Sequence, residues 1–310
     1  MLQSIIDDIK REYSYGNMVT RIVITNVVVF IAINLVWIIA RLSHTWQTPE
    51  WYNSILHTFM VSSDWMHNLT HPWAFFTHMY MHEGFWHLLW NMLILYWFGR
   101  IVGDLIGNQR ILPIYLISGF AGGLIFALTS RLLPVAAAGP IYALGASAAV
   151  MGMVVAAGVL APNYIMRLLL IGDVKLKYIV AGLVFMDLIG MAGNVNTGGY
   201  IAHLGGSVFG WLFVLQLSNG TDWALPVNRL LNGIQGIFQN LFSRSRRGPK
   251  VVYKAQGSKK QAPPKNSKGN AQSDVNDQEK IDRILDKIKE SGYDSLTAEE
   301  KSFLFNASKK

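Results

Sequence analysis

The sequence predicts an all-α membrane protein with six transmembrane helices. Two observations of composition support this: 51% of the 310 residues are hydrophobic and only 15% are charged, whereas soluble domains carry about 25% charged residues. A third is that apolar runs able to cross a hydrocarbon core of about 30 Å recur along the chain. The expected spans are residues 22–41, 87–106, 111–130, 145–161, 176–193 and 200–217.

A charged segment precedes the first span, and the spans differ in length. Residues 1–21 are charged and amphipathic, so we expect a cytoplasmic N-terminal segment before a membrane domain that covers residues 22–218. The run 145–161 is the shortest, at the lower limit of roughly 17 residues for a spanning helix. The chain has no cysteine, which excludes disulfides and thiol catalysis.

Basic residues predict the orientation. Residues 42–99 contain no Lys or Arg, whereas Arg167, Lys175 and Lys177 lie in the connection before the fifth span. Because positive residues favour the cytoplasmic side, we expect both termini inside and the loop 42–86 outside. Arg131 is the single exception to this pattern. We expect a multi-pass protein of a bacterial cytoplasmic (inner) membrane.

Residues 219–277 predict an amphipathic and basic, disordered linker. Residues 244–268 hold nine Lys and Arg and no acid, with Pro, Gly and Ser between them, a composition typical of disorder. Such a stretch can fix topology and attract anionic lipid headgroups, or it can bind nucleic acid. The first interpretation is favoured beside a membrane domain, so we expect the lipid bilayer as partner and no nucleic acid.

Residues 278–310 predict a small soluble helical hairpin. Apolar residues recur at helical spacing in its first half, namely Ile281, Ile284, Leu285 and Ile288. Gly292 is expected to end the first helix, and Thr297 with Glu300 has the spacing of a capping box for the second. The hairpin carries no group of residues that suggests catalysis.

Polar residues inside the predicted spans fall in three clusters, which are functional candidates because such residues are costly in a bilayer. The first precedes and enters the second span, the second is Ser147 in the short fourth span, and the third is His203 in the sixth. The members of the first cluster are His78, His82, His87 and Asn91. Under the predicted orientation all three clusters lie at the outer ends of their helices.

Ser147 lies at the predicted start of its helix, where backbone N–H groups lack partners and the helix dipole is positive. Negative charge on a carbonyl oxygen attacked by Ser147 would therefore develop beside donors. Stripes of small residues can let the fourth and sixth helices approach closely, which would carry the His203 ring toward Ser147. These small residues are Ala148, Gly152 and Ala156 on one helix and Gly206 and Gly210 on the other.

His87 and Asn91 are one helical turn apart and share a face, so both can donate hydrogen bonds to a developing oxyanion. A metal site is the alternative for the histidines. The zincin pattern needs two histidines four residues apart with a glutamate between them, but His82 and His87 are five apart and Gly84 intervenes. We therefore expect no metal and no cofactor, and a structural role for His78.

These motifs resemble the rhomboid intramembrane serine proteases over roughly residues 20–218. The family's histidine, second histidine and asparagine match His82, His87 and Asn91. Its GxSx motif matches Gly145-Ala146-Ser147-Ala148, and its AHxxGxxxG motif matches the segment that contains Ala202, His203, Gly206 and Gly210. The order of the three motifs is also that of the family. The resemblance implies a rhomboid-type six-helix bundle.

The resemblance implies a Ser147–His203 dyad with no third, acidic member, and an oxyanion site made by the Ser147 backbone amide, His87 and Asn91. His82, Gly145, Gly206 and Gly210 would be structural supports. The implied substrates are single-span membrane proteins, cut near the outer interface by a serine endopeptidase. Met151 stands where some members carry a tyrosine that stacks on the catalytic histidine, so the sequence leaves open what supports the His203 ring.

The sequence allows three alternatives. Asp187 in the fifth span could complete a triad, but a helix-end or packing role is favoured. A catalytically inactive scaffold would have lost Ser147 or His203, and this sequence keeps both. A transporter should carry charges or broken helices at mid-membrane in paired positions, whereas the polar residues here gather at one end. The sequence therefore favours an intramembrane serine protease.

Overall fold

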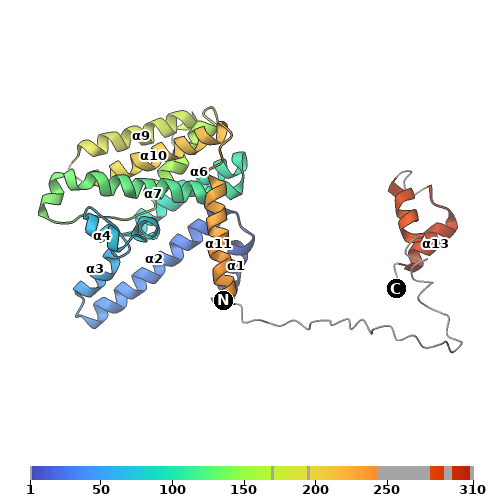
Figure 1. Ribbon diagram of the computed structural model, residues 1–310, viewed down its shortest axis with the longest axis horizontal. Coiled ribbons are helices and arrows are strands. Elements are labelled where there is room, and N and C mark those ends of the chain that lie inside the picture. Colours follow the sequence, from blue (N-terminus) through green and yellow to red (C-terminus); the bar gives the residue numbers. More distant parts are fainter. Residues whose placement is uncertain (1, 169–170, 194–195, 243–279, 290–294, 308–310) are drawn as a thin grey trace, which may run out of the picture. The chain divides into compact units, whose positions relative to one another are not determined.

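A computed structural model describes residues 2–168, 171–193, 196–242, 280–289 and 295–307. The chain divides into two compact units, Met1–Ser245 and Arg246–Lys310, which are described separately. The longer helices of the first unit (Figure 1) are α1 (Leu2–Tyr15), α2 (Met18–Ser43), α6 (Phe85–Ile106), α7 (Ile111–Thr129), α8 (Ser147–Leu160), α9 (Leu176–Ala192), α10 (Thr197–Ser218) and α11 (Ala224–Phe242).

Shorter elements connect these helices. The loop between α2 and α6 holds α3 (Glu50–His57), β1 (Val61–Ser62), α4 (Trp65–Thr70), α5 (Ala74–Thr77) and the 3₁₀ helix η1 (His78–Tyr80). The 3₁₀ helices η2 (Asn108–Arg110), η3 (Ser130–Leu132) and η4 (Pro134–Ala138) flank and follow α7, and β2 (Tyr142–Ala143) precedes α8. Strands β3 (Ile165–Leu168) and β4 (Gly172–Lys175) join α8 to α9.

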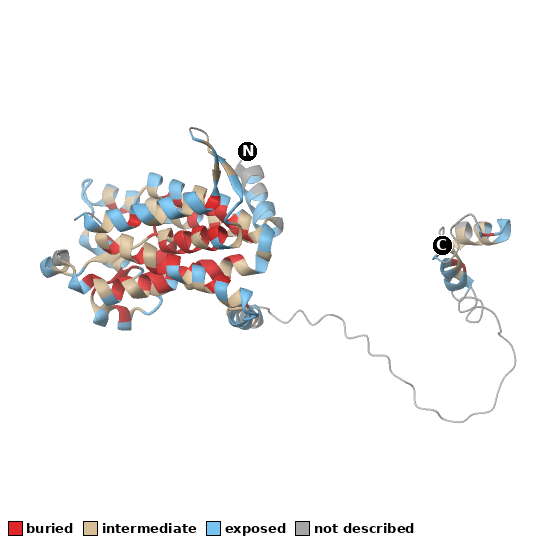
Figure 2. Cartoon of the chain, turned by 90° about the horizontal axis from the view of Figure 1, so that it is seen from above, coloured by how far each residue is buried: buried red, intermediate tan, exposed pale blue. Residues whose placement is uncertain are grey.

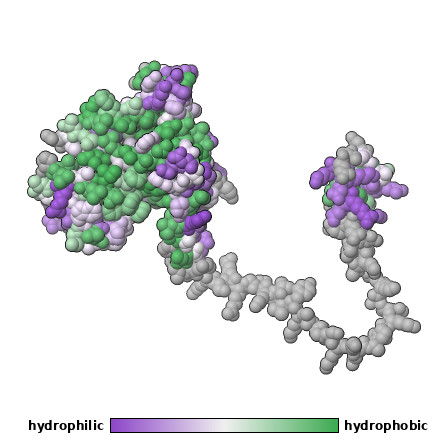
Figure 3. Space-filling view, turned by 45° about the horizontal axis from the view of Figure 1, so that its top comes forward, coloured by the Kyte–Doolittle hydropathy of each residue, from purple (hydrophilic) through white to green (hydrophobic). Residues whose placement is uncertain are grey.

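The structure confirms a mostly helical membrane protein. Four described segments are long and apolar enough to cross a membrane, namely Met18–Ser43, Phe85–Ile106, Asn108–Leu132 and Thr197–Ser218. Helices α8 and α9 coincide with the other two predicted runs but have only 14 and 17 residues. Six helices therefore lie where spans were expected, while the count of six crossings stays a prediction. Apolar side chains cover much of the visible face of this unit (Figure 3).

Helix α8 lies at the centre of the first unit and packs on α6, α7 and α10. Buried residues gather along these helices, and Figure 2 shows buried residues concentrated in the interior of this unit. The approach of α8 and α10 depends on glycine, because a Cβ atom at Gly206 would collide with the backbone of Ala148, and one at Gly210 with the backbone of Gly152. The predicted small-residue stripes are thus the surfaces through which these two helices touch.

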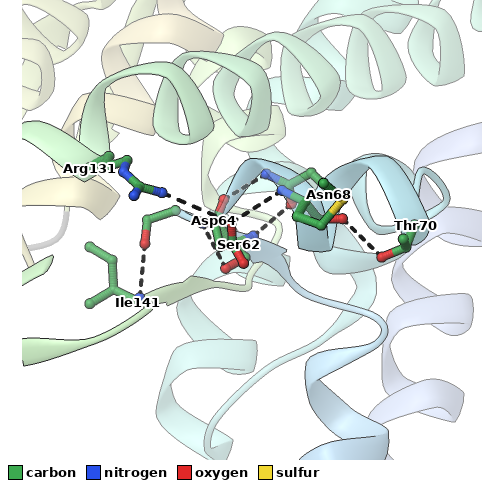
Figure 4. Close-up of polar contacts among 8 residues, drawn as sticks. Ser62, Asp64, Asn68, Thr70, Arg131 and Ile141 are labelled. Atoms are coloured by element: carbon green, nitrogen blue, oxygen red, sulfur yellow. Dashed lines mark hydrogen bonds and ion pairs between the residues drawn. The ribbon is translucent and has the colours of Figure 1, made fainter.

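The loop between α2 and α6 is anchored to the segment before α8. Strands β1 and β2 pair antiparallel, with Val61 opposite Ala143 and Ser62 opposite Tyr142. The Asn68 side chain holds β1 by accepting from the Ser62 N–H at 2.9 Å and donating to the Ser62 carbonyl at 2.7 Å (Figure 4). This pairing fixes the backbone that leads into the start of α8.

Arg131, the exception to the predicted charge pattern, has a partner in the same loop. Its guanidinium lies 4.0 Å from the carboxylate of Asp64 (Figure 4). Both side chains are largely exposed, so the pair contributes at most about 1 kcal/mol. In the predicted orientation Arg131, in η3 directly after α7, lies on the outer side, opposite to the other basic residues. Asp64 gives it an acidic partner there.

The connection before α9 contains a hairpin that the sequence analysis did not predict. Strands β3 and β4 pair antiparallel from Ile165 opposite Lys175 to Leu168 opposite Gly172. An exposed ion pair joins Arg167 and Asp173 at 2.8 Å. Two of the basic residues used to predict the orientation, Arg167 and Lys175, therefore lie on this hairpin.

The segment predicted as a linker, residues 219–277, begins with a helix. Helix α11 covers its early part, and the Arg110 side chain pairs with Asp222 at 2.8 Å just before that helix. The apolar residues of α11 recur every three or four positions, a spacing that favours a helix with one covered face. The disorder prediction was thus wrong for α11, and the basic stretch 244–268 lies outside the described residues.

The second unit is described over 280–289 and 295–307, where 280–289 is helical and α13 spans Ala298–Ala307. The capping box is confirmed, because the Thr297 N–H donates to Glu300 Oε2 at 2.8 Å and the Glu300 N–H donates to Thr297 Oγ1 at 3.3 Å. Lys287 also pairs with Glu300 at 2.9 Å. Gly292 lies outside the described residues, and the hairpin stays a prediction.

Candidate active site

A cavity of about 1420 Å³ lies among α6, α8, α9 and α10 in the first unit. Its lining includes all four residues to which the sequence analysis gave chemical roles, namely Ser147, His203, His87 and Asn91. These residues come from three helices separated by long stretches of sequence. The structure therefore brings members of all three predicted polar clusters to one cavity, whereas His78 and His82 do not line it.

Ser147 is the first residue of α8. Gly145 precedes it with a φ of +121°, a conformation that favours glycine, and its N–H donates to the His78 carbonyl at 2.9 Å. The chain thus turns sharply from β2 into the helix, with a fixed backbone before the serine. The side chain of Ser147 projects at a helix N-terminus, where unpaired N–H groups lie close by.

His87 and Asn91 approach the same turn from α6. A Cβ atom at Gly145 would lie only 2.8 Å from His87 Cε1 and 2.9 Å from Nε2, and 3.7 Å from Ser147 Oγ. The imidazole therefore packs against the backbone that precedes the serine. Asn91 is buried, and one of its two amide hydrogens is donated to the His87 carbonyl at 2.9 Å. Its second amide hydrogen can be donated to a bound group.

His82 and His78 precede this pair along the chain, and both are buried. The His82 ring meets the His87 ring edge-on, with ring centres 5.2 Å apart. Burial lowers the pKa of His82 to about 4, so that ring is neutral at physiological pH. The pKa of His78 is also lowered to about 4 by burial, and its Nδ1 lies 2.9 Å from the Ala74 carbonyl. These contacts agree with the structural role expected for His78.

The His203 ring is held by two residues that the sequence analysis did not assign to it. Its Nδ1 lies 2.9 Å from Oδ1 of Asp187 on α9. The Tyr200 ring meets it edge-on at 6.0 Å between ring centres. The sequence favours a helix-end or packing role for Asp187, and that prediction does not include its contact with His203. The signal was available, since Asp187 is the only acidic residue in the apolar run 176–193.

Metal ligation has no support in the described residues, because no group of three or more His, Cys, Asp or Glu side chains there is arranged to hold an ion. The expectation of no metal and no cofactor stays a prediction. The cavity holds a hydroxyl at a helix start, an imidazole beside a carboxylate, and hydrogen-bond donors from α6. Groups of these kinds can together carry out covalent acyl transfer.

Fold and site together define an α-helical membrane protein with a polar cavity that holds a serine and a histidine. The family model described as "Rhomboid domain" matches residues 69–220, and a second, described as "Family of unknown function (DUF6576)", matches residues 271–310. The first match contains all the predicted site residues and begins after α2. The chain is thus similar to the rhomboid family over residues 69–220.

The chain is also similar to two curated proteins whose names include rhomboid. The chain is 27% identical over 180 residues to "Rhomboid protein 1, mitochondrial" of Saccharomyces cerevisiae, a match that covers 57% of this chain and 50% of the relative. It is 38% identical over 73 residues to "RHOMBOID-like protein 1" of Arabidopsis thaliana, covering 23% of this chain and 19% of the relative. The chain therefore spans half or less of the length of these relatives.

Proposed function

We propose that this protein is an intramembrane serine endopeptidase, with Ser147 as the nucleophile and His203 as the general base. The rhomboid domain indicates intramembrane proteolysis as the general activity. The observation that carries the finer assignment is the shared cavity, in which Ser147 and His203 lie with His87 and Asn91. An inactive scaffold has less support, because no residue needed for the chemistry is missing.

The proposed reaction uses the side chains of this cavity. Ser147 Oγ attacks the scissile carbonyl carbon while its proton passes to Nε2 of His203. Negative charge develops on the carbonyl oxygen and is stabilised by the Ser147 backbone N–H, His87 and Asn91. The C–N bond then breaks as the proton passes from Nε2 to the leaving amine. Water, losing a proton to Nε2, hydrolyses the acyl-enzyme, and that proton returns to Ser147 Oγ. The packing of His87 against Gly145 supports its role as a donor near the serine.

We propose single-span membrane proteins as substrates, cleaved near the outer membrane interface. The cavity walls support an apolar chain segment as the ligand, since they include Trp86 and Trp90 of α6 and Leu183 and Met186 of α9. The polar groups gather at the ends of α6, α8 and α10 that meet the loop before α6 and the turn before α8. A substrate can thus enter between apolar walls and be cut where water is available.

The proposed setting is a multi-pass protein with both termini in the cytoplasm of a bacterial cell and the loop 42–86 outside. The charge pattern of the sequence supports this orientation, and the curated relatives come from yeast and a plant. The basic stretch 244–268 is proposed to bind anionic lipid headgroups by charge attraction.

The decisive experiment labels purified, detergent-solubilised protein with a fluorophosphonate, which reacts with activated serines, and measures cleavage of a single-span substrate in parallel. Wild type should be labelled and active, whereas Ser147→Ala should be neither. Ser207→Ala, a buried serine on α10, is the matched control and should keep both properties. Labelling that survives in Ser147→Ala would contradict the assignment, as would inhibition by a chelator that added metal reverses.

A further inference from the structure

Asp187 is buried on a helix whose other side chains mostly face outward. Leu176 and Asp187 are the two buried residues of α9, whereas the large side chains Phe185, Met186 and Ile189 are more than half exposed. A carboxylate is among the costliest groups to place in a membrane helix, and such residues face the bundle interior and pair with another group. The position of Asp187 therefore calls for a specific partner.

That partner is His203. Asp187 Oδ1 lies 2.9 Å from His203 Nδ1, and the two side chains are only 10% and 18% exposed. An ionised carboxylate can only accept hydrogen bonds, so Nδ1 must carry the hydrogen that joins the two groups. The second ring nitrogen, Nε2, is then the basic one in a neutral imidazole. Only that nitrogen can accept the proton of a serine hydroxyl.

The ring orientation is fixed from a second direction. Helices α9 and α10 approach so closely at Gly190 that a Cβ atom there would collide with the Tyr200 ring. Tyr200 in turn meets His203 edge-on. Met151, which lines the same cavity, has no flat ring to stack on the imidazole. The carboxylate thus supplies an orienting contact that a thioether side chain cannot supply.

We infer that Asp187 is a positioning residue for His203, so that the base is oriented by a carboxylate from α9. This inference rests on the proposed function. As the Ser147 Oγ–carbon bond forms, the serine proton moves to Nε2 and the ring becomes positively charged. The Asp187 carboxylate accepts the hydrogen bond from Nδ1–H throughout and stabilises that imidazolium. When Nε2 passes the proton to the leaving amine, the ring returns to its starting tautomer.

A purely structural reading makes a different prediction. If Asp187 only fastened α9 to α10, its loss would lower the thermal stability and would leave kcat unchanged in the molecules that remain folded. If it orients the base, kcat should fall while KM and stability change little. Substrate binding to the apolar walls does not involve the carboxylate, so the two readings separate cleanly.

The test compares Asp187→Asn, Asp187→Ala and Asp187→Glu in proteoliposomes, with kcat, KM and the unfolding temperature measured for each. Asn keeps the shape but can present its amide hydrogens to Nδ1, which favours the wrong tautomer. In soluble serine proteases such a change costs about 10⁴ in kcat. We expect Asn and Ala to lower kcat at least 100-fold with KM within about threefold of wild type, and Glu, which keeps the carboxylate, to recover part of the loss.

The control is Asp222→Asn, which removes a carboxylate paired with Arg110 outside the cavity and should leave kcat unchanged. Wild-type kcat in Asp187→Asn, or a loss of kcat that only follows a loss of folded protein, would overturn the inference. Wild type and Ser147→Ala are measured alongside. An inactive wild type or an active Ser147→Ala would instead refute the proposed function, and the inference would fall with it.

Discussion

Helices α8 and α9 both line the cavity, yet they are packed in opposite ways. Ten of the 14 residues of α8 are buried, compared with two of the 17 residues of α9. The difference follows from side-chain size, because α8 is rich in alanine and glycine and is surrounded by α6, α7 and α10. Ser147 therefore begins a helix that is embedded in the core, whereas α9 contributes one buried polar side chain, Asp187, to the site.

This arrangement suits the proposed division of labour. A nucleophile must be held within a fraction of an ångström of its target, and close packing of α8 supplies that constraint. A helix with few buried side chains, such as α9, has fewer contacts to break when a substrate enters.

The largest effect should come from the two residues of the proposed dyad. Ser147→Ala and His203→Ala should each abolish cleavage of a single-span substrate while the protein stays folded. Because the two residues act as one unit, the double variant should be no worse than either single variant. Turnover measured in detergent, with the unfolding temperature as the check on folding, decides the point. Substantial turnover by Ser147→Ala would remove the chemical role assigned to α8.

A smaller loss of activity is expected from the donors on α6. His87→Ala or Asn91→Ala should lower kcat, since one oxyanion donor is typically worth about 10²–10³ in rate. Backbone N–H groups at the start of α8 remain in place, so the loss should not be complete. Substrate binding, measured with the inactive Ser147→Ala background, should be unchanged. Wild-type turnover in both variants would show that the oxyanion site lies elsewhere.

The packing contrast itself can be tested with one methyl group. Gly206→Ala places a Cβ atom against the Ala148 backbone, whereas Gly182→Ala on α9 places one in open space. The first should destabilise the protein by about 1–3 kcal/mol. The second should be neutral or stabilising by up to about 1 kcal/mol, because alanine favours helix over glycine. Equal unfolding temperatures for the two variants would contradict the tight contact between α8 and α10.

The smallest effect on chemistry is expected from removing the C-terminal unit. A chain ending at residue 243 keeps every helix that lines the cavity, so it should cleave a model substrate in neutral detergent at the wild-type rate. In anionic membranes the basic tail of the full chain should be held at the bilayer surface, by roughly 1 kcal/mol per basic residue near that surface. High salt should weaken that difference. A truncated protein that is folded but inactive in detergent would make the tail part of the catalytic unit.

Much of the fold could be predicted because its signals are local. Six apolar runs gave the positions of α2, α6, α7, α8, α9 and α10 to within a few residues, since hydrophobic length and helix-start residues are read along the chain. The hairpin of β3 and β4 was missed, because its two short strands carry no strict alternation of polar and apolar residues. Helix α11 was included in the predicted linker because basic and small polar residues follow it directly.

For the candidate site, sequence alone determined which side chains to consider. Motif spacing selected Ser147, His203, His87 and Asn91, since each motif lies within one helix or turn. Only the tertiary structure decided that Asp187 bonds to His203, because that contact joins two helices and has no local pattern. Distances between helices depend on how small residues such as Gly206 let backbones approach. Such packing is a property of surfaces that meet in space, so the orientation of the base could not be predicted from the order of residues.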